Sequence, residues 1–239
     1  MPAILELRRY TLHAGRRDDL IELFDRELVE SQEAVGLQVV GQFRDLDDPD
    51  QFVWLRGFAD MPGRAEGLGA FYGGPVWQAH RAAANTTMLD SSNVLLLRPA
   101  GPDRGFCDEA PRPTIGATEC PNSLVTATIY RLRRPADAAF VRFFEQQIVP
   151  VLVEAGARPI AAYQTYAVEN NFPALPVRTD HPVFVWFARF DDMEAHRACE
   201  ERLARSKHWT YILLPALADH FAQVATVLRL APTARSRLR

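Results

Sequence analysis

Apolar and polar residues alternate in short runs of this chain, and longer stretches between the runs carry apolar residues at helical spacing. Residues 3–12 interleave apolar with charged side chains, as a half-buried strand does. Residues 18–34 place apolar side chains every three or four positions and precede Gly36, which predicts an amphipathic helix with a glycine end signal. The apolar face of this helix contains Leu20, Leu23, Phe24 and Leu28.

Two further strands are predicted at 37–43 and 52–58, on either side of a charged turn. A Gly-rich stretch then leads to a helix at 76–84, and the apolar run within 92–99 predicts a fourth strand. The predicted order is β-α-β-β-α-β. This is the ferredoxin-like unit, in which helices cover one face of a four-stranded antiparallel sheet.

The second half of the chain repeats this pattern. FVWLRGFADM at 52–61 and FVWFARFDDM at 184–193 lie 132 residues apart (184 − 52) and agree at six of ten positions. Nearer the N-terminus the offset is 120, as between Tyr10 and Tyr130. Internal similarity at a period of about half the chain indicates a duplicated domain. An insertion in the second copy, within 167–181, accounts for most of the change in offset.

The repeats divide the chain into a first repeat at 1–99, a Pro-rich linker at 100–121, a second, diverged repeat at 122–232 and a frayed tail at 233–239. A single unit leaves one face of its sheet bare, and a second copy on the same chain can cover that face. The predicted fold class is therefore α+β, with two ferredoxin-like repeats that close into one pseudo-dimeric α/β barrel.

Residues from the first strand, the last helix and the last strand of the first repeat form a family pattern. They are Glu6, Leu7, Arg8, Tyr10, Leu12, Trp77, Leu96, Leu97 and Pro99. This set resembles the NIPSNAP family, whose members open with a strand of the type E-L-R-x-Y-x-L and close with a Trp-bearing helix and a strand ending in L-x-P. The second repeat matches more loosely and lacks the Glu and Arg of the first strand. The resemblance implies the dimeric α/β-barrel superfold, formed here within one chain, and this superfold hosts unrelated activities.

Two strands of the first repeat carry the residues that suit a ligand site. Side chains two positions apart on a strand point the same way, so Glu6, Arg8 and Tyr10 share one face. We expect the apolar face of that strand to meet the helices, which places the charged row in the barrel lumen. Arginine binds carboxylates bidentately and aromatic rings form apolar walls, so this lumen suits a small anionic or enolisable aromatic ligand. The ligand-binding candidates are Glu6, Arg8, Tyr10, Trp54 and Arg56.

The same residues can also have a purely structural role. Glu6 and Arg8 can form an ion pair that bridges strands, and Trp54 can be a core residue. Glu6 is a poor general acid, because an adjacent arginine lowers the pKa of a carboxyl group and a general acid needs a raised one. The second repeat has neutral residues at the equivalent positions: Thr126, Thr128, Tyr130 and Ala188. Any site is therefore expected once, in the first half, and no catalytic residue is assigned.

Composition narrows the functional classes. Hydrophobic residues make up 48% of the 239 positions, enough for a buried core, and the net charge of −3 gives no basic footprint for nucleic acid. No apolar run reaches the 18 residues of a membrane span, and the N-terminus lacks a secretory pattern. Three cysteines without a CxxC motif indicate free thiols, so we expect a cytoplasmic protein.

The six histidines show no metal-binding spacing, so neither a metal nor a cofactor is expected. Some haem enzymes share the barrel superfold and use one helical histidine as axial ligand, and spacing does not identify such a residue here. Two hypotheses remain open. The chain is a small-molecule-binding barrel, which includes cofactor-independent enzymes of the isomerase or monooxygenase type, or it is a non-catalytic interaction scaffold. Association of fused barrels into a homo-oligomer is open as well.

Overall fold

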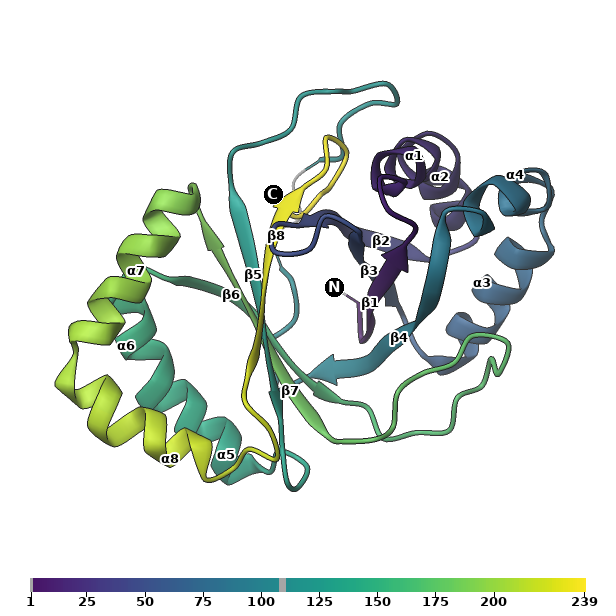
Figure 1. Ribbon diagram of the computed structural model, residues 1–239. Helices are drawn as coiled ribbons and strands as arrows, with labels where there is room; N and C mark the ends of the chain where they lie inside the picture. Colours follow the sequence, from purple (N-terminus) through teal and green to yellow (C-terminus); the bar gives the residue numbers. More distant parts are fainter. Residues whose placement is uncertain (1, 108–110) are drawn as a thin grey trace.

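The computed structural model describes residues 2–107 and 111–239, so residue 1 of the first repeat and residues 108–110 of the linker lie outside the described residues. Eight strands in the described chain form one closed barrel in the order β1-β3-β2-β8-β5-β7-β6-β4. Each repeat contributes four neighbouring strands, and its helices cover the outside of its own half of the barrel (Figure 1). The fold class predicted from the sequence is confirmed.

The two repeats contain the same elements in the same order, except that the second has an additional π-helical segment, η3, between its last two α-helices. The first contains β1 (Ile4–Leu12), α1 (Arg17–Leu23), the π-helical η1 (Phe24–Leu28), α2 (Val29–Glu33), β2 (Gln38–Asp45), β3 (Gln51–Phe58), α3 (Met61–Gly73), α4 (Pro75–Asn85) and β4 (Met88–Pro99). The second contains β5 (Leu124–Arg131), α5 (Ala138–Phe143), η2 (Phe144–Ile148), α6 (Val149–Glu154), β6 (Arg158–Thr165), β7 (Val183–Phe190), α7 (Met193–Arg205), η3 (Trp209–Leu213), α8 (Leu214–Ala218) and β8 (Thr226–Pro232).

The barrel closes where an edge strand of one repeat pairs with an edge strand of the other. β2 pairs antiparallel with β8, with Phe43 opposite Pro232. β4 pairs antiparallel with β6, with Leu97 opposite Thr165. Each repeat would otherwise expose two unpaired edges and one bare sheet face, so closure satisfies the backbone groups of both repeats together.

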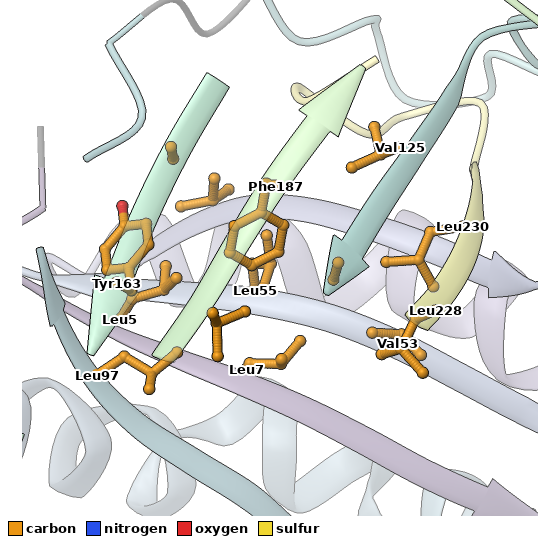
Figure 2. Packing of buried hydrophobic residues seen from close by; sticks show 14 of the residues in the cluster. Leu5, Leu7, Val53, Leu55, Leu97, Val125, Tyr163, Phe187, Leu228 and Leu230 are labelled. Atoms are coloured by element: carbon orange, nitrogen blue, oxygen red, sulfur yellow. The ribbon is translucent and has the colours of Figure 1, made fainter. Parts of the chain in front are cut away.

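The barrel lumen is filled by apolar side chains from both repeats. Leu5, Leu7 and Leu55 from the first repeat meet Phe187 and Leu230 from the second, and all five are fully buried (Figure 2). The expectation that the charged row of β1 faces the lumen was wrong. Alternation along a strand separates two faces but does not say which layer each face meets. Here the face that carries Leu5 and Leu7 lines the lumen, and the charged face meets the helices.

A separate core lies between each half of the sheet and its helices. In the first repeat it contains Tyr10 and Trp54 from the sheet and Phe24, Leu28 and Phe71 from the helical layer. The second repeat has its own equivalent core, which contains residues such as Tyr130, Trp186 and Phe144. The protein therefore has one shared lumen core and two outer cores. Any site that involves the charged row of β1 must lie in the first outer core.

The segments before β5 and after β8 are packed onto the barrel. Phe106 is buried in the lumen core, and its backbone N–H donates to the Tyr163 hydroxyl at 3.1 Å. Residues 233–239 were expected to be frayed, and that expectation was wrong. Ser236 and Leu238 are buried, and the Leu238 N–H donates to the Val40 carbonyl at 3.1 Å. The tail continues beyond β8 along β2, where it finds backbone partners that a hydropathy pattern does not reveal.

None of the helices among the described residues is both long enough and apolar enough to span a membrane.

Candidate functional site

Four residues of the first outer core form a buried ionic cluster, which we call the arginine cluster: Glu6, Arg8, Arg56 and Arg64. Glu6 and Arg8 lie on β1, and Arg56 stands directly opposite Glu6 on β3. Arg64 comes from the first turn of α3. All four side chains are at most 1% exposed to solvent.

Glu6 accepts five hydrogen bonds within the arginine cluster. Its Oε2 accepts from Arg8 Nη1 at 2.7 Å and from Arg56 Nε and Nη2 at 3.1 and 2.7 Å. Its Oε1 accepts a bidentate pair from Arg64 Nε and Nη2 at 2.9 and 2.7 Å. The carboxylate is thus fully satisfied, and charged bidentate pairs of this kind are among the strongest hydrogen bonds in proteins.

The arginine cluster carries a buried positive charge. Three guanidinium groups and one carboxylate give a net charge of +2 (3 − 1), and no second carboxylate among the described residues pairs with any of the three arginines. Burial alone would raise the pKa of Glu6, but its three guanidinium partners, Arg56 first, outweigh burial and hold that pKa well below its usual range. Glu6 therefore stays ionised, and its single negative charge is shared by three guanidinium groups, which leaves a charge of +2 uncompensated.

Aromatic faces account for part of this imbalance. The Arg8 guanidinium carbon lies 5.4 Å from the ring centres of both Tyr10 and Trp54, and that of Arg56 lies 5.0 Å from the Trp54 ring. Cation–π contacts of this geometry contribute roughly 0.5–2 kcal/mol each. That is less than the several kcal/mol that it costs to desolvate an ion. The rings therefore stabilise the buried positive charge in part, but they do not compensate for the whole cost of burying it.

Two tyrosine hydroxyls lie next to the cluster as hydrogen-bond acceptors. Arg8 Nε donates to the Tyr10 hydroxyl at 2.9 Å, and Arg56 Nη1 donates to the Tyr72 hydroxyl at 3.4 Å. Neither hydroxyl donates to any residue in the described part of the chain, so both hydroxyl protons are available. Burial raises the pKa of Tyr10 and outweighs the opposing effect of Arg8, so this phenol remains a donor.

A small cavity adjoins these hydroxyls. It has a volume of about 30 Å³, and Tyr10, Trp54, Tyr72 and Gln32 line it together with apolar side chains. Trp54 Nε1 is buried and finds no acceptor among the described residues. A buried donor without a partner costs about 1–3 kcal/mol, and native structures rarely leave one without a reason. The three residues that carry these donors, Tyr10, Trp54 and Tyr72, therefore line one cavity, whose volume is about that of a water molecule.

The helical layer orients the amide of Gln32 toward the sheet. Gln32 Oε1 accepts from Arg56 Nη1 at 3.2 Å, and its Nε2 donates to the Leu28 carbonyl at 2.7 Å. Leu28 ends the π-helical segment η1, which is the type of helix irregularity that often occurs at functional sites. Its carbonyl is satisfied by the side chain, so the amide is fixed between helix and sheet.

Helix α3 lies close enough to the sheet to deliver Arg64. The Asp60 side chain caps its N-terminus by accepting from the Gly63 N–H at 2.7 Å. One turn later, a Cβ at Gly67 would lie 2.4 Å from Leu37 Cδ2, so any larger residue here would require Leu37 or the helix to shift. The sequence did not identify Arg64 as a site residue. Its Gly-rich surroundings favoured a loop, and the side chain is brought to Glu6 only by helix packing.

The insertion of the second repeat completes the site from outside. Arg64 Nη1 donates to the side-chain oxygens of Asn170 and Asn171 at 3.1 and 2.8 Å. Phe172 stacks on the Tyr72 ring at 6.1 Å between ring centres. This loop between β6 and β7 leaves its own repeat and runs to the side of α3 (Figure 1). The arginine cluster is thus enclosed by both repeats, although its charges come from the first alone.

All five candidates from the sequence are therefore brought together, but in the outer core. Tyr10 and Trp54 line the cavity, whereas Glu6, Arg8 and Arg56 belong to the charged cluster that contacts Tyr10 and Tyr72. In the second repeat the same sheet face carries Thr126, Thr128 and Ala188, so the charged site occurs once. The described residues contain no group of three His, Cys, Asp or Glu side chains that could hold a metal ion.

The NIPSNAP family model matches residues 5–101, which span β1 to the end of β4. The first repeat is a NIPSNAP domain. The matched range includes all four residues of the arginine cluster: Glu6, Arg8, Arg56 and Arg64.

Two solved structures resemble this chain over nearly its whole length, and a third resembles about two fifths of it. A provisionally assigned monooxygenase from Lactobacillus acidophilus NCFM has a TM-score of 0.58 at 12% identity, covering 97% of this chain and 94% of its own. An anthrone oxidase-like protein has a TM-score of 0.54 at 10% identity, covering 98% and 94%. A NIPSNAP family protein from Agrobacterium tumefaciens str. C58 matches 41% of this chain and 92% of its own at 24% identity, with a TM-score of 0.38. No curated protein matches the sequence.

Proposed function

We propose that this protein binds a small anionic aromatic compound, with a negatively charged oxygen of the ligand held in the cavity between Tyr10, Trp54 and Tyr72. The observation that carries the proposal is the unpaired Trp54 indole N–H, on a cavity that Tyr10 and Tyr72 also line and that lies next to a buried charge of +2. Such preorganised donors stabilise an oxyanion strongly in a site from which water is excluded.

The lining of the cavity selects the class of ligand. Phe24, Phe71 and Trp77 supply apolar and aromatic walls, and the donors supply the polar end. A carboxylate, a phenolate or an enolate on a ring fits both features. The cavity of about 30 Å³ accommodates the charged oxygen. Tyr72, Trp77 and Met88, which are half-buried at its outer side, would move to admit the ring.

The chemistry that the site supports is stabilisation of an anion. Glu6 is held ionised by its partners, Tyr10 is held protonated by burial, and the pKa of Arg8 is raised by its partners although burial opposes this. None of the three exchanges a proton near neutral pH. A reaction here would proceed through an enolate or phenolate of the substrate, which fits the isomerase or monooxygenase type and the names of two structural neighbours. A purely structural scaffold gains nothing from burying an uncompensated charge of +2, which weighs against that alternative.

Titration calorimetry with a matched pair of probes tests the proposal. Benzoate and benzamide have the same shape, but only benzoate is charged, so we expect saturable one-to-one binding of benzoate and none of benzamide. Trp54→Phe removes the unpaired donor and should weaken benzoate binding by about tenfold to a hundredfold, the value of a hydrogen bond to a charged group. Trp186→Phe, the equivalent change in the second repeat, is the control and should leave benzoate binding unchanged.

Equal binding of the acid and the amide would contradict the proposal, because the buried charge would then play no part. Benzoate binding that responds equally to Trp54→Phe and Trp186→Phe would contradict the assignment to the first repeat.

A further inference from the structure

The second repeat contains a larger cavity at the position that corresponds to the arginine cluster. It lies between the sheet and helices α7 and α8 and has a volume of about 220 Å³, compared with about 30 Å³ in the first repeat. The internal offsets of the sequence relate residues that line the two cavities. Tyr130 and Trp186 line this cavity where Tyr10 and Trp54 line the first, at offsets of 120 (130 − 10) and 132 (186 − 54).

Shorter side chains explain the larger volume. The offset of 120 replaces Glu6, Arg8 and Gln32 by Thr126, Thr128 and Leu152, and the offset of 132 replaces Arg56 and Arg64 by Ala188 and His196. Three long cationic side chains and one carboxylate are thereby lost together. The same offset of 132 also replaces Gly67, which allows α3 its close approach, by Cys199, whose side chain lines the cavity.

The second cavity is electrically neutral inside. Burial lowers the pKa of His196 and raises the pKa of the Cys199 thiol, so both groups are uncharged at neutral pH. Burial also raises the pKa of Tyr130. The charged group of its lining is Glu200, whose side chain is 61% exposed at the rim, 3.6 Å from His196 Nδ1. A buried anion would find no cation in this lining.

Two polar atoms in the neutral cavity lack partners. His196 Nδ1 and Trp186 Nε1 are buried and make no hydrogen bond of acceptable geometry with the described residues, although the indole lies near the Tyr130 hydroxyl. His196 is only 5% and Trp186 only 7% exposed, so neither atom is satisfied by bulk solvent. Unpaired buried groups of this kind are costly, and a ligand oxygen would satisfy them.

We propose that this cavity, which we call the neutral pocket, is a second binding site. It is specific for an uncharged aromatic alcohol, or a similar molecule of one or two rings that carries an uncharged polar group. An apolar cavity of about 150 Å³ holds benzene, so about 220 Å³ holds somewhat more than one ring. The ligand's oxygen meets Trp186 and His196, and its rings meet the surrounding apolar side chains. This inference is independent of the anion site in the first repeat.

Calorimetry with 2-naphthol and 2-naphthoate at pH 7 tests the neutral pocket, because the two probes share their rings and differ in charge. We expect 2-naphthol to bind one-to-one with the neutral pocket and 2-naphthoate to be excluded from it. Trp186→Phe should weaken 2-naphthol binding about fivefold, the value of a neutral hydrogen bond. Trp54→Phe is the matched control and should have no effect on it.

Two variants that fill the pocket distinguish a loss of ligand binding from a loss of folding. Thr128→Met occupies the sheet position where the first repeat carries the long Arg8, and Cys199→Leu adds volume from α7. Each should weaken 2-naphthol binding by about tenfold or more while the melting temperature stays the same or rises, because an empty cavity is being filled. Binding that survives both substitutions would overturn the proposal, as would absence of 2-naphthol binding to the wild type. Loss of 2-naphthol and 2-naphthoate binding together in Thr128→Met would refute the specificity for neutral ligands.

Discussion

Glu6→Gln is the change that most strongly perturbs the arginine cluster. The substitution keeps the shape of the side chain but removes its charge, so the buried net charge rises from +2 to +3 (3 − 0). The new amide also directs a donor at guanidinium groups that have only donors of their own. Five charge-assisted hydrogen bonds, at 2.7–3.1 Å, are weakened or lost together.

The expected loss is large because the side chain is 0% exposed. Removing one partner from a buried ion pair costs roughly 3–5 kcal/mol in the free energy of unfolding. With an unfolding entropy of about 2.1 cal/mol/K per residue, the 239 residues give about 0.5 kcal/mol/K, so the melting temperature should fall by roughly 6–10 °C. Calorimetry or circular dichroism at pH 7 measures this shift.

Asp191→Asn is the matched control for charge. It also removes one negative charge, but the Arg158–Asp191 pair is exposed, at 59% and 67%, so the loss should stay within about 1 kcal/mol. Adding Arg8→Met to Glu6→Gln should recover part of the stability, because it removes one of the buried cations. If Glu6→Gln melts within about 2 °C of wild type, as the control should, the reasoning about a dry, charge-bearing cluster is wrong.

Four further predictions concern other parts of the molecule. Because its arginine partners hold the pKa of Glu6 in the folded protein well below its ordinary value of 4.5, the contribution of Glu6 to stability is complete above about pH 4.5 and is lost as the pH falls. Urea titrations from pH 6 to pH 3 should therefore show wild type losing more stability than Glu6→Gln. Asn171→Leu removes an acceptor of Arg64 and should destabilise the protein by about 1–3 kcal/mol and speed hydrogen exchange in 166–182, both measurable by mass spectrometry with denaturant. Residues 1–104 and 117–239 expressed separately should each aggregate or self-associate in size-exclusion chromatography, since each exposes the lumen face of its sheet. Cys107 and Cys120 are exposed and should react with a thiol reagent within minutes, whereas Cys199, which is buried, should react only on unfolding.

The architecture could be predicted from the sequence because two independent signals agree on it. The alternation of strand and helix patterns gives the ferredoxin-like unit, and the internal offsets of 120 and 132 show that the unit occurs twice. Closure into a barrel then follows from the need to cover two bare sheet faces. The outcome is the strand order in which β2 meets β8 and β4 meets β6.

The position of the site could not be predicted in the same way. Periodicity separates the Leu5 and Leu7 face from the Glu6 and Arg8 face, but both faces of β1 are buried. Hydropathy suggested that the apolar face meets the helices, whereas in the structure the apolar face lines the lumen enclosed by the eight strands. The charged face can be buried against the helices only because its charged side chains find hydrogen-bond partners there.

Those partners come from segments that carry no local signal. Arg64 lies in a Gly-rich stretch, and Asn170 and Asn171 lie in an insertion that seemed to belong to the second repeat alone. Their contacts join residues more than one hundred positions apart, 106 and 107 along the chain. Only the packed structure brings Arg64 to Glu6 and the two asparagines to Arg64. The buried tail at 233–239 is a similar case, since its polar composition conceals its pairing with β2.

Crystals grown in sodium bromide provide the most direct test of the anion site. Bromide scatters anomalously, so its position is located without interpreting the shape of the density. The account predicts an anomalous peak in the cavity of about 30 Å³, within hydrogen-bond distance of Trp54 Nε1 and of the Tyr10 and Tyr72 hydroxyls. It also predicts that the peak weakens in Trp54→Phe. A cavity that holds only water in bromide, with anomalous peaks confined to arginines on the surface, would contradict the central claim that the buried charge of the first repeat binds an anion.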